Sequence, residues 1–324
     1  MQPLFAARLN SFAARPELYW GDQRKPSTAE CLERAASVES LDTVDLNYPD
    51  QVEGLPPGAL RQMLGRLTLN GFAMRYYGDP AYRAGAFTHA DPAVRQRAID
   101  LTKRGVDALQ EAGGRLMTLW LGQDGFDYAF GADHARLWDL ELEGIRAVAE
   151  HAPGIDISLE YKPNEPRAFS MLPDAATTLL AIRELGLPNL GVTLDFAHVL
   201  YADEQPAYAA ALVGRFSRLL GVHLNDGYGK RDDGLMVGAV HTLQTLELLR
   251  EVRRQGYPGC LYFDTFPDSS GLDPVAECAA NIATVRGMLG VLERLDAVPE
   301  LEAAIARQDA VTAQRLVQRE LLGA

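Results

Sequence analysis

The sequence predicts an α/β fold, a single (β/α)₈ TIM barrel with a C-terminal helical extension. Short apolar segments alternate with longer helix-like ones, and several apolar segments are continuous, as in strands that are buried on both faces. Eight such strands suit a closed parallel barrel, which typically takes about 250 residues of a chain. No Gly-x-Gly-x-x-Gly motif opens the first strand–helix unit, which disfavours a doubly wound dinucleotide-binding sheet.

The expected elements follow one another as strand, then helix. Strands are expected at residues 5–12, 43–47, 71–76, 115–121, 155–161, 189–194, 219–224 and 259–264. Helices are expected at residues 28–38, 58–69, 92–112, 134–150, 175–185, 207–219 and 242–255. Ser27 or Thr28 precedes Glu30, and Asp91 precedes Pro92, which are typical helix starts.

Beyond Gly287 the pattern changes to an apolar stripe at helical spacing. We therefore expect a metal-binding barrel at residues 1–287 and a helical tail at 288–324. The tail has no sheet to cover, so its apolar face packs back on its own barrel or on a partner subunit. Packing on a partner subunit is favoured, and it predicts a homodimer or homotetramer. The stripe consists of Leu289, Leu292, Leu295, Val298, Leu301, Ile305, Val311, Leu316 and Leu321.

Composition and charge narrow the class of partner. The formal net charge of −13 disfavours nucleic acid and anionic membrane surfaces, whereas metal cations and small polyols fit better. The chain starts without the basic and apolar regions of a signal peptide, and no apolar run approaches the ~20 residues of a membrane span. Its three cysteines show no metal-binding spacing. These features predict a cytoplasmic protein.

Four residues stand at the ends of consecutive predicted strands: Glu160, Asp195, His223 and Asp264. In a barrel of this kind, function gathers at the C-terminal ends of the strands. Each residue alone could be a helix cap or half of an ion pair. Together, three carboxylates and one imidazole suit Mg²⁺, Mn²⁺ or Co²⁺, and a cation would compensate the cost of burying several carboxylates.

A second ion is also compatible with the sequence. Asp195 and His198 are spaced so that they can point the same way from one turn, and Asp232 and Asp233 add carboxylates in the loop at residues 230–234. These residues could hold a second metal that Asp195 bridges to the first. The alternative is that the loop is a solvated charged turn, so the sequence predicts one or two divalent ions per subunit.

One segment carries a family resemblance. Residues 160–167, Glu-Tyr-Lys-Pro-Asn-Glu-Pro-Arg, resemble the Glu-Pro-Lys-Pro-Asn-Glu-Pro that ends the fifth strand of xylose isomerases. Residues 79–88 and the Trp-Leu-Gly-Gln-Asp-Gly at 120–125 are similar to that family as well, and the likeness runs from about residue 40 to 285.

The resemblance implies roles for individual residues. Lys162 falls on the lysine that hydrogen-bonds the carbonyl oxygen of the substrate, while Trp120 and Tyr77 fall on aromatic residues that pack against the sugar. His198 falls on the imidazole ligand of the second, catalytic metal, and Glu165 on a carboxylate bonded to a neighbouring segment. The ligands of the first metal are then Glu160, Asp195, His223 and Asp264.

Departures from the family pattern concern both metals and the substrate. Xylose isomerases carry Glu at the place of Asp195 and Asp at the place of His223, and these two changes resemble rhamnose isomerases and ketose 3-epimerases instead. Asn47 takes the place of the histidine that assists ring opening, and an amide cannot act as a base near neutral pH. Gly234 occupies one expected ligand position of the second metal.

Three functions remain open. The first is aldose–ketose isomerisation of a free monosaccharide by a metal-assisted hydride shift, with Lys162 beside the carbonyl oxygen, unless Lys162 only pairs with Glu165 or another carboxylate. The second is a ketose 3-epimerase or related enzyme that forms an enediolate, with Glu160 and Asp264 as acid and base. The third is a sugar-binding barrel without catalysis, which Asn47 keeps open.

Overall fold

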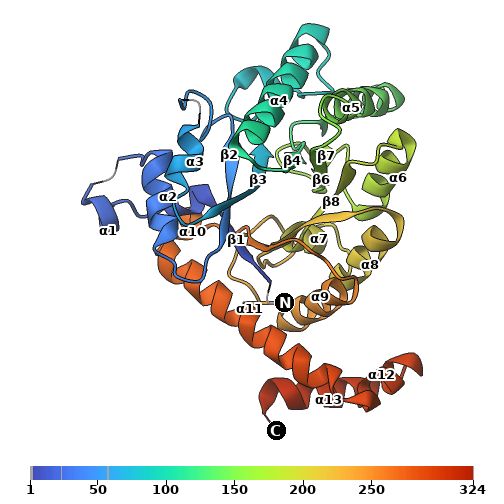
Figure 1. Ribbon diagram of the computed structural model, residues 1–324. Coiled ribbons are helices and arrows are strands. Elements are labelled where there is room, and N and C mark those ends of the chain that lie inside the picture. The colour runs from blue at the N-terminus through green and yellow to red at the C-terminus, as the bar shows by residue number, and fades with distance from the viewer. Residues whose placement is uncertain (1–2, 23, 57, 324) are drawn as a thin grey trace.

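The fold is a closed barrel of eight parallel strands (Figure 1). The computed structural model describes residues 3–22, 24–56 and 58–323. Each barrel strand is hydrogen-bonded to the barrel strand that precedes it in the chain, and β10 closes on β1, so the predicted (β/α)₈ fold is confirmed. The barrel strands are β1 Phe5–Arg8, β2 Thr43–Tyr48, β3 Thr68–Met74, β4 Leu116–Trp120, β6 Asp156–Glu160, β8 Leu190–Asp195, β9 Leu219–Leu224 and β10 Leu261–Phe263.

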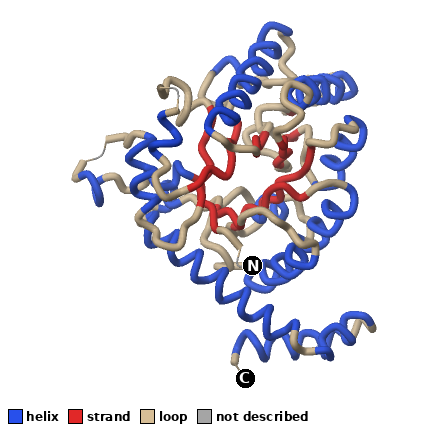
Figure 2. Tube along the Cα trace, in the orientation of Figure 1, coloured by secondary structure: helices blue, strands red, loops and turns tan. Residues whose placement is uncertain are grey.

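Helices cover the outside of the barrel (Figure 2). Ser27 and Glu30 form a reciprocal capping box at the start of α2, and Asp91 accepts a hydrogen bond from Ala93 N at the start of α4. The longer helices of the barrel are α2 Thr28–Ala36, α4 Pro92–Ala112, α5 His134–Ala149, α6 Ala175–Leu185, α8 Pro206–Phe216, α9 Thr242–Arg254 and α11 Pro274–Asp296. Shorter helical segments are α1 Glu17–Trp20, η1 Leu9–Ala13, α3 Ala59–Met63, η2 Pro80–Tyr82, α7 Phe196–Tyr201 and α10 Pro267–Ser270.

The structure differs from the sequence prediction in several segments. The helix expected at residues 58–69 is only α3, which ends at Met63, and β3 already begins at Thr68. The apolar run expected as a strand to residue 12 leaves the sheet after Arg8, and η1 buries Leu9 and Phe12 as a turn of helix. Helix α7 and the two-stranded antiparallel sheet of β5 (Gly125–Phe126) and β7 (Phe169–Ser170) were not expected. These elements have six residues or fewer, too few to display a hydrophobic period.

The strands are buried in the way that the continuous apolar runs predicted. Every residue of β2 and of β8 is buried, because side chains that point inward fill the barrel and side chains that point outward pack under the helices. Gly221 of β9 is needed for a close approach, since a Cβ there would lie 2.4 Å from Thr193 Oγ1 of β8. Tight packing at this level fixes the strand ends that carry the site.

The C-terminal tail comprises the end of α11 with α12 Pro299–Ala306 and α13 Ala310–Leu322 (Figure 1). The predicted boundary after Gly287 falls inside α11, whose buried face continues through Leu292 and Leu295. The helix ends at Asp296, shortly before Pro299 begins the next one. Helices α12 and α13 pack on each other and on α11, so part of the apolar stripe is covered within the chain, including Leu301 and Leu316.

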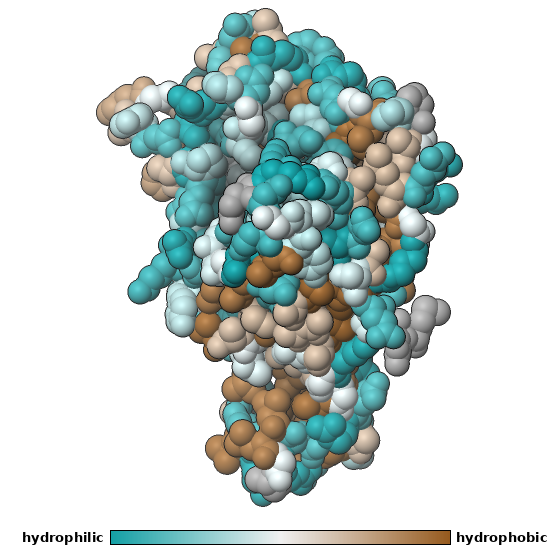
Figure 3. All heavy atoms as spheres, turned by 90° about the vertical axis from the view of Figure 1, so that its left-hand side faces the viewer, coloured by the Kyte–Doolittle hydropathy of each residue, from teal (hydrophilic) through white to brown (hydrophobic). Residues whose placement is uncertain are grey.

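Some apolar side chains of the tail stay on the surface. Ile305 of α12 and Val311 and Leu322 of α13 are exposed, and Figure 3 shows hydrophobic surface at the lower end of the molecule, where these helices lie. Among the described helices, α11 is the one long and apolar enough to pass a length-and-composition test for a membrane span. Its residues Ile282 and Val285 are buried, as in the core helix of a globular protein.

Candidate metal centre and active site

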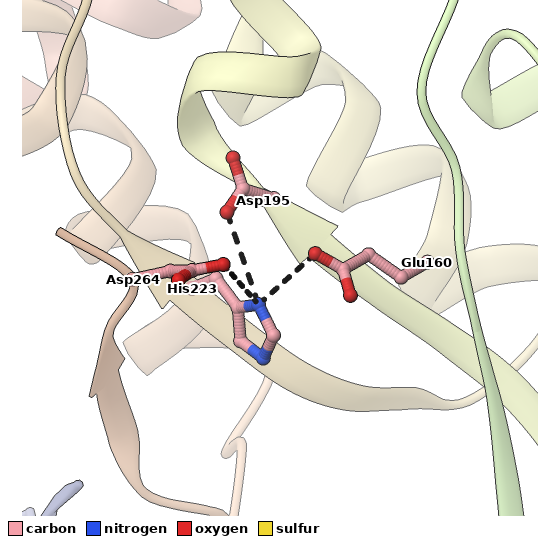
Figure 4. A group of neighbouring side chains, drawn as sticks. All are labelled: Glu160, Asp195, His223 and Asp264. Atoms are coloured by element: carbon pink, nitrogen blue, oxygen red, sulfur yellow. Dashed lines mark ion pairs between the residues drawn. The ribbon is translucent and has the colours of Figure 1, made fainter. Parts of the chain in front are cut away.

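The four strand-end residues converge on one point at the C-terminal rim of the barrel (Figure 4). Glu160 is the last residue of β6, Asp195 the last of β8, and Asp264 follows β10 directly. His223 lies in β9 and is paired in register with Asp195. Because β6, β8, β9 and β10 are neighbours in the barrel, each contributes one ligand atom, and the four atoms lie within 4.8 Å of one another.

Distances and unmet hydrogen bonds fit a bound cation. His223 Nδ1 lies 3.3 Å from Glu160 Oε1, 3.8 Å from Asp195 Oδ2 and 3.9 Å from Asp264 Oδ2. Glu160 Oε2, Asp264 Oδ1 and His223 Nδ1 are buried and make no hydrogen bond to a described residue. Such atoms are costly to bury without a partner, and three oxygen donors with one nitrogen suit Mg²⁺, Mn²⁺ or Co²⁺.

Asn225, which the sequence prediction missed, holds the carboxylate of Asp195. Its Nδ2 donates to Asp195 Oδ1 and Oδ2 at 3.1 and 3.0 Å and to the backbone oxygen of Asp264 at 3.1 Å. Its Oδ1 accepts from Ala197 N at 2.8 Å. One buried amide therefore orients two candidate ligands, as residues behind a metal site commonly do. Its place two residues after His223, at the end of β9, was the available signal.

His198, Asp232 and Lys162 form a chain beside these ligands. His198 sits in α7, which begins where Asp195 caps it; His198 Nδ1 lies 2.9 Å from the backbone oxygen of Tyr161 and Nε2 lies 3.1 Å from Asp232 Oδ2. Lys162 Nζ lies 3.2 Å from Asp232 Oδ2 and 3.0 Å from Glu165 Oε2. The tyrosine carbonyl requires a proton on Nδ1, which leaves Nε2 to face Asp232.

The two aspartates predicted for a second metal are separated. Asp232 faces His198 and lines the cavity described below. Asp233 is turned away: its Oδ2 accepts a hydrogen bond from Tyr228 N at 2.8 Å, and its Oδ1 pairs with Arg231 Nε at 2.7 Å. The carboxylate of Asp233 therefore stabilises the turn of the loop, whereas that of Asp232 lies in the site.

Burial and opposite charges shift the pKa values of this cluster in opposite directions. Burial raises the pKa of Asp195 to about 7. Burial opposes ionisation of Glu160 too, but the imidazole of His223 outweighs it and lowers the pKa of Glu160 to about 2. Burial lowers the pKa of His198, yet Asp195 and Asp232 together raise it to about 9. The same competition, dominated by Asp232, raises the pKa of Lys162, which stays protonated.

A cavity of about 130 Å³ opens at the ligands and receives the predicted substrate residues. Trp120 and Tyr77 form one wall, with their ring centroids 6.3 Å apart and edge to face. Lys162 and Asn47 line the cavity, and so do three residues that the sequence prediction missed: Arg8, Arg75 and Phe266. A charged residue at the end of a predicted strand was the available signal for Arg75. A larger cavity of about 190 Å³ lies between residues 48–61 and α4, away from these ligands.

Comparisons with curated proteins find relatives of this chain among the xylose isomerases. The chain is 29% identical over 194 residues to the xylose isomerase of Thermus thermophilus, and 28% identical over 194 residues to that of Thermus caldophilus. These matches cover 58% of this chain and 50% of each relative, so the chain spans about half the length of the curated relatives it matches.

Solved structures share the fold over nearly the whole chain. A structure of L-ribulose 3-epimerase matches with a TM-score of 0.71 and 18% identity, covering 92% of this chain and 97% of that one. A D-tagatose 3-epimerase-like protein matches with a TM-score of 0.70 and 15% identity, covering 90% and 98%. Residues 32–287 match the family model of the xylose isomerase-like TIM barrel. The chain therefore belongs to the xylose isomerase-like TIM barrel family.

Proposed function

We propose that this protein is a divalent-metal-dependent aldose–ketose isomerase that acts on a monosaccharide by a hydride shift between C1 and C2. One observation carries the proposal: the protonated Lys162 amine lines the same small cavity as Glu160 and Asp264, two members of the four-residue cluster, against the apolar wall of Trp120 and Tyr77. A fixed cation beside a metal suits polarisation of a carbonyl oxygen.

Each residue of the site has a separate role in the proposed reaction. A divalent ion on the four ligands would supply Lewis-acid polarisation of two neighbouring substrate oxygens. Lys162, held between Asp232 and Glu165, donates a hydrogen bond to the oxygen on which negative charge develops. Trp120 and Tyr77 exclude water from the reacting carbons, which protects hydride transfer from competing proton exchange. Asn47 Oδ1 already accepts from Arg75, so its amide hydrogens are left for a sugar hydroxyl.

A second candidate is a ketose 3-epimerase, which would move a proton through an enediolate. Glu160 Oε1 and Asp264 Oδ2 both lie close to His223 Nδ1, at 3.3 and 3.9 Å, so two carboxylates meet at one metal position as acid and base would. Lys162 favours the isomerase, because a fixed cation promotes carbonyl polarisation. A sugar-binding barrel without catalysis is the least supported, because simple binding has no evident use for the unpartnered ligand atoms.

The deciding experiment follows substrate hydrogens by NMR. Metal-loaded protein is incubated with a panel of aldoses and ketoses in D₂O, with chelated protein in parallel. Conversion of aldose to ketose that retains the C–H hydrogen and stops on chelation supports the isomerase. Deuterium at C3 of a ketose supports the epimerase instead and overturns the isomerase. Asp264→Asn should abolish conversion, while Asp156→Asn, at the opposite end of a barrel strand, should retain it.

Two further expectations belong to this proposal. The exposed apolar residues on α12 and α13 support a homodimer or homotetramer formed through the tail. A cytoplasmic location, with neither nucleic acid nor membrane as partner, stays a prediction from charge and composition.

A further inference from the structure

Arg75 lines the cavity and forms no direct ion pair with a described carboxylate, although Glu160 and Asp264 act on its charge from a greater distance. It follows β3 directly, and its backbone N donates to Tyr48 O at 2.9 Å, which places the side chain at the rim of the barrel. Its Nε donates to Asn47 Oδ1 at 3.1 Å, and its guanidinium carbon lies 5.5 Å from the ring centre of Trp120. Among the described residues, no carboxylate lies within 4.0 Å of it, and its two terminal nitrogens make no hydrogen bond.

The other cations of the cavity are already engaged. Arg8 lies between Asp264 and Asp268, at 3.7 and 3.6 Å, and Lys162 lies between Asp232 and Glu165. Arg75 is partly buried, and its terminal nitrogens, unlike Nε, make no hydrogen bond to a described residue, so an anionic ligand that binds them would compensate their loss of water. Arg75 lines a cavity that a ligand would enter, and the two terminal nitrogens of a guanidinium form a fork that suits a carboxylate or a phosphate.

We infer that the natural substrate carries an anionic group, a carboxylate or a phosphate, which Arg75 binds through its two terminal nitrogens. This inference rests on the proposed sugar isomerase and narrows its substrate class to acidic sugars. Asn47 and the ring of Trp120 hold the guanidinium in place, so the fork is positioned before the ligand arrives. Lys162, which contacts the same ring at 5.5 Å, would then face the reacting carbonyl.

The test compares ligands that share one carbon skeleton. Metal-loaded, full-length protein is titrated by calorimetry with erythritol, D-erythronate and erythritol 4-phosphate, with metal chelation by each ligand in solution subtracted. We expect one or both anions to bind at least tenfold more tightly than erythritol, which corresponds to about 1.4 kcal/mol. The carboxylate and phosphate arms distinguish the two sources of negative charge, and preference for either supports the inference. Equal or weaker binding of both anions overturns it.

Variants of Arg75 show whether the anion binds Arg75 or the metal, because a hydroxy acid can also chelate a divalent ion. Arg75→Gln should lose the preference for the anion, and Arg75→Lys should keep part of it, since the amine retains the charge but not the fork. Arg104→Gln is the matched control: Arg104 pairs with Glu53 on the surface and does not line the cavity. An anion preference that survives in Arg75→Gln overturns the inference. If Arg75→Gln does not fold, Arg75→Lys decides: an anion preference as large as that of the wild type overturns the inference.

The outcome is separable from that of the proposed function. Conversion of neutral sugars without any anion preference would leave the isomerase standing and remove the acidic substrate. An anion preference that depends on Arg75, without hydrogen transfer on any sugar, would leave the anion site standing and remove the isomerase.

Discussion

The contacts of Lys162 are compatible both with a structural ion pair and with a catalytic role. Its amine pairs with Glu165 and Asp232, as expected of a lysine that neutralises the mouth of the barrel. The same amine lines the cavity and faces the ring of Trp120 at 5.5 Å. The ion pairs keep it charged and aimed, which a group that polarises a carbonyl also requires. Geometry therefore supports both roles, and kinetics distinguish them.

Lys162→Met should leave metal binding nearly intact and lower kcat and kcat/KM together, by roughly 100-fold if the amine contributes about 3 kcal/mol in the transition state. Both quantities are measured on the metal-saturated variant. Lys103→Met on the outside of the barrel, in α4, is the matched control and should retain full turnover. Near-normal kcat in Lys162→Met would remove the lysine from the mechanism and weaken the isomerase.

At the scale of elements, α5 carries a buried acid outside the active site. Glu141 is fully buried, and neither carboxylate oxygen has a hydrogen-bond partner among the described residues. Nearby, Asp124, in the turn between β4 and β5, accepts backbone hydrogen bonds from Ala86, Phe87 and Thr88 and so ties the β3–α4 loop to the barrel. Burial, with the charge of Asp124 added, raises the pKa of Glu141 well above its usual value.

Glu141→Gln should stabilise the protein increasingly as the pH rises. The native state holds the proton on Glu141, whereas the unfolded chain releases it above its ordinary pKa of 4.5, so wild-type stability falls from about that pH up to the raised native pKa. Glutamine does not titrate, so the gain in free energy of unfolding over the wild type should be larger at pH 8 than at pH 5. Urea unfolding at pH 5 and pH 8 measures it.

The matched control for this experiment is Glu143→Gln, because Glu143 lies on the same helix and is exposed beside Arg136. It should change stability little at either pH. A difference between Glu141→Gln and wild type that stays constant across the pH range would contradict a buried, protonated Glu141.

At the scale of the whole molecule, the apolar residues of the tail fall into two groups, one buried within the chain and one exposed. Leu301 and Leu316 are buried within the chain, whereas Ile305, Val311 and Leu322 are exposed on the same two helices. Packing against α11 therefore accounts for part of the stripe and leaves the rest for a partner subunit. The natural place to shorten the chain is after Ala297, because a cut at residue 287 would remove buried side chains of α11.

We expect the full chain to form a dimer or tetramer and the chain that ends at Ala297 to be a monomer. Light scattering gives the mass of each, against 35.4 kDa for one full-length chain. Val311→Asp should weaken assembly, because it places a charge in the apolar contact, while Gln314→Asp, also exposed on α13, should have little effect. A full-length monomer would refute assembly through the tail.

The sequence by itself determined the barrel and the four-residue cluster. Continuous apolar strands that alternate with helices indicate a parallel sheet buried on both faces, and eight of them suit a closed barrel. The ends of its parallel strands meet at one rim, so Glu160, Asp195, His223 and Asp264 approach one another. Only the tertiary structure decided the remainder: that Asp232 enters the site and Asp233 does not, that Asn225 orients Asp195, and that Arg75 bonds Asn47 through Nε and forms no ion pair with a described carboxylate. The physical reason is that these outcomes depend on loop paths and on contacts between segments far apart in the chain, which no local period encodes.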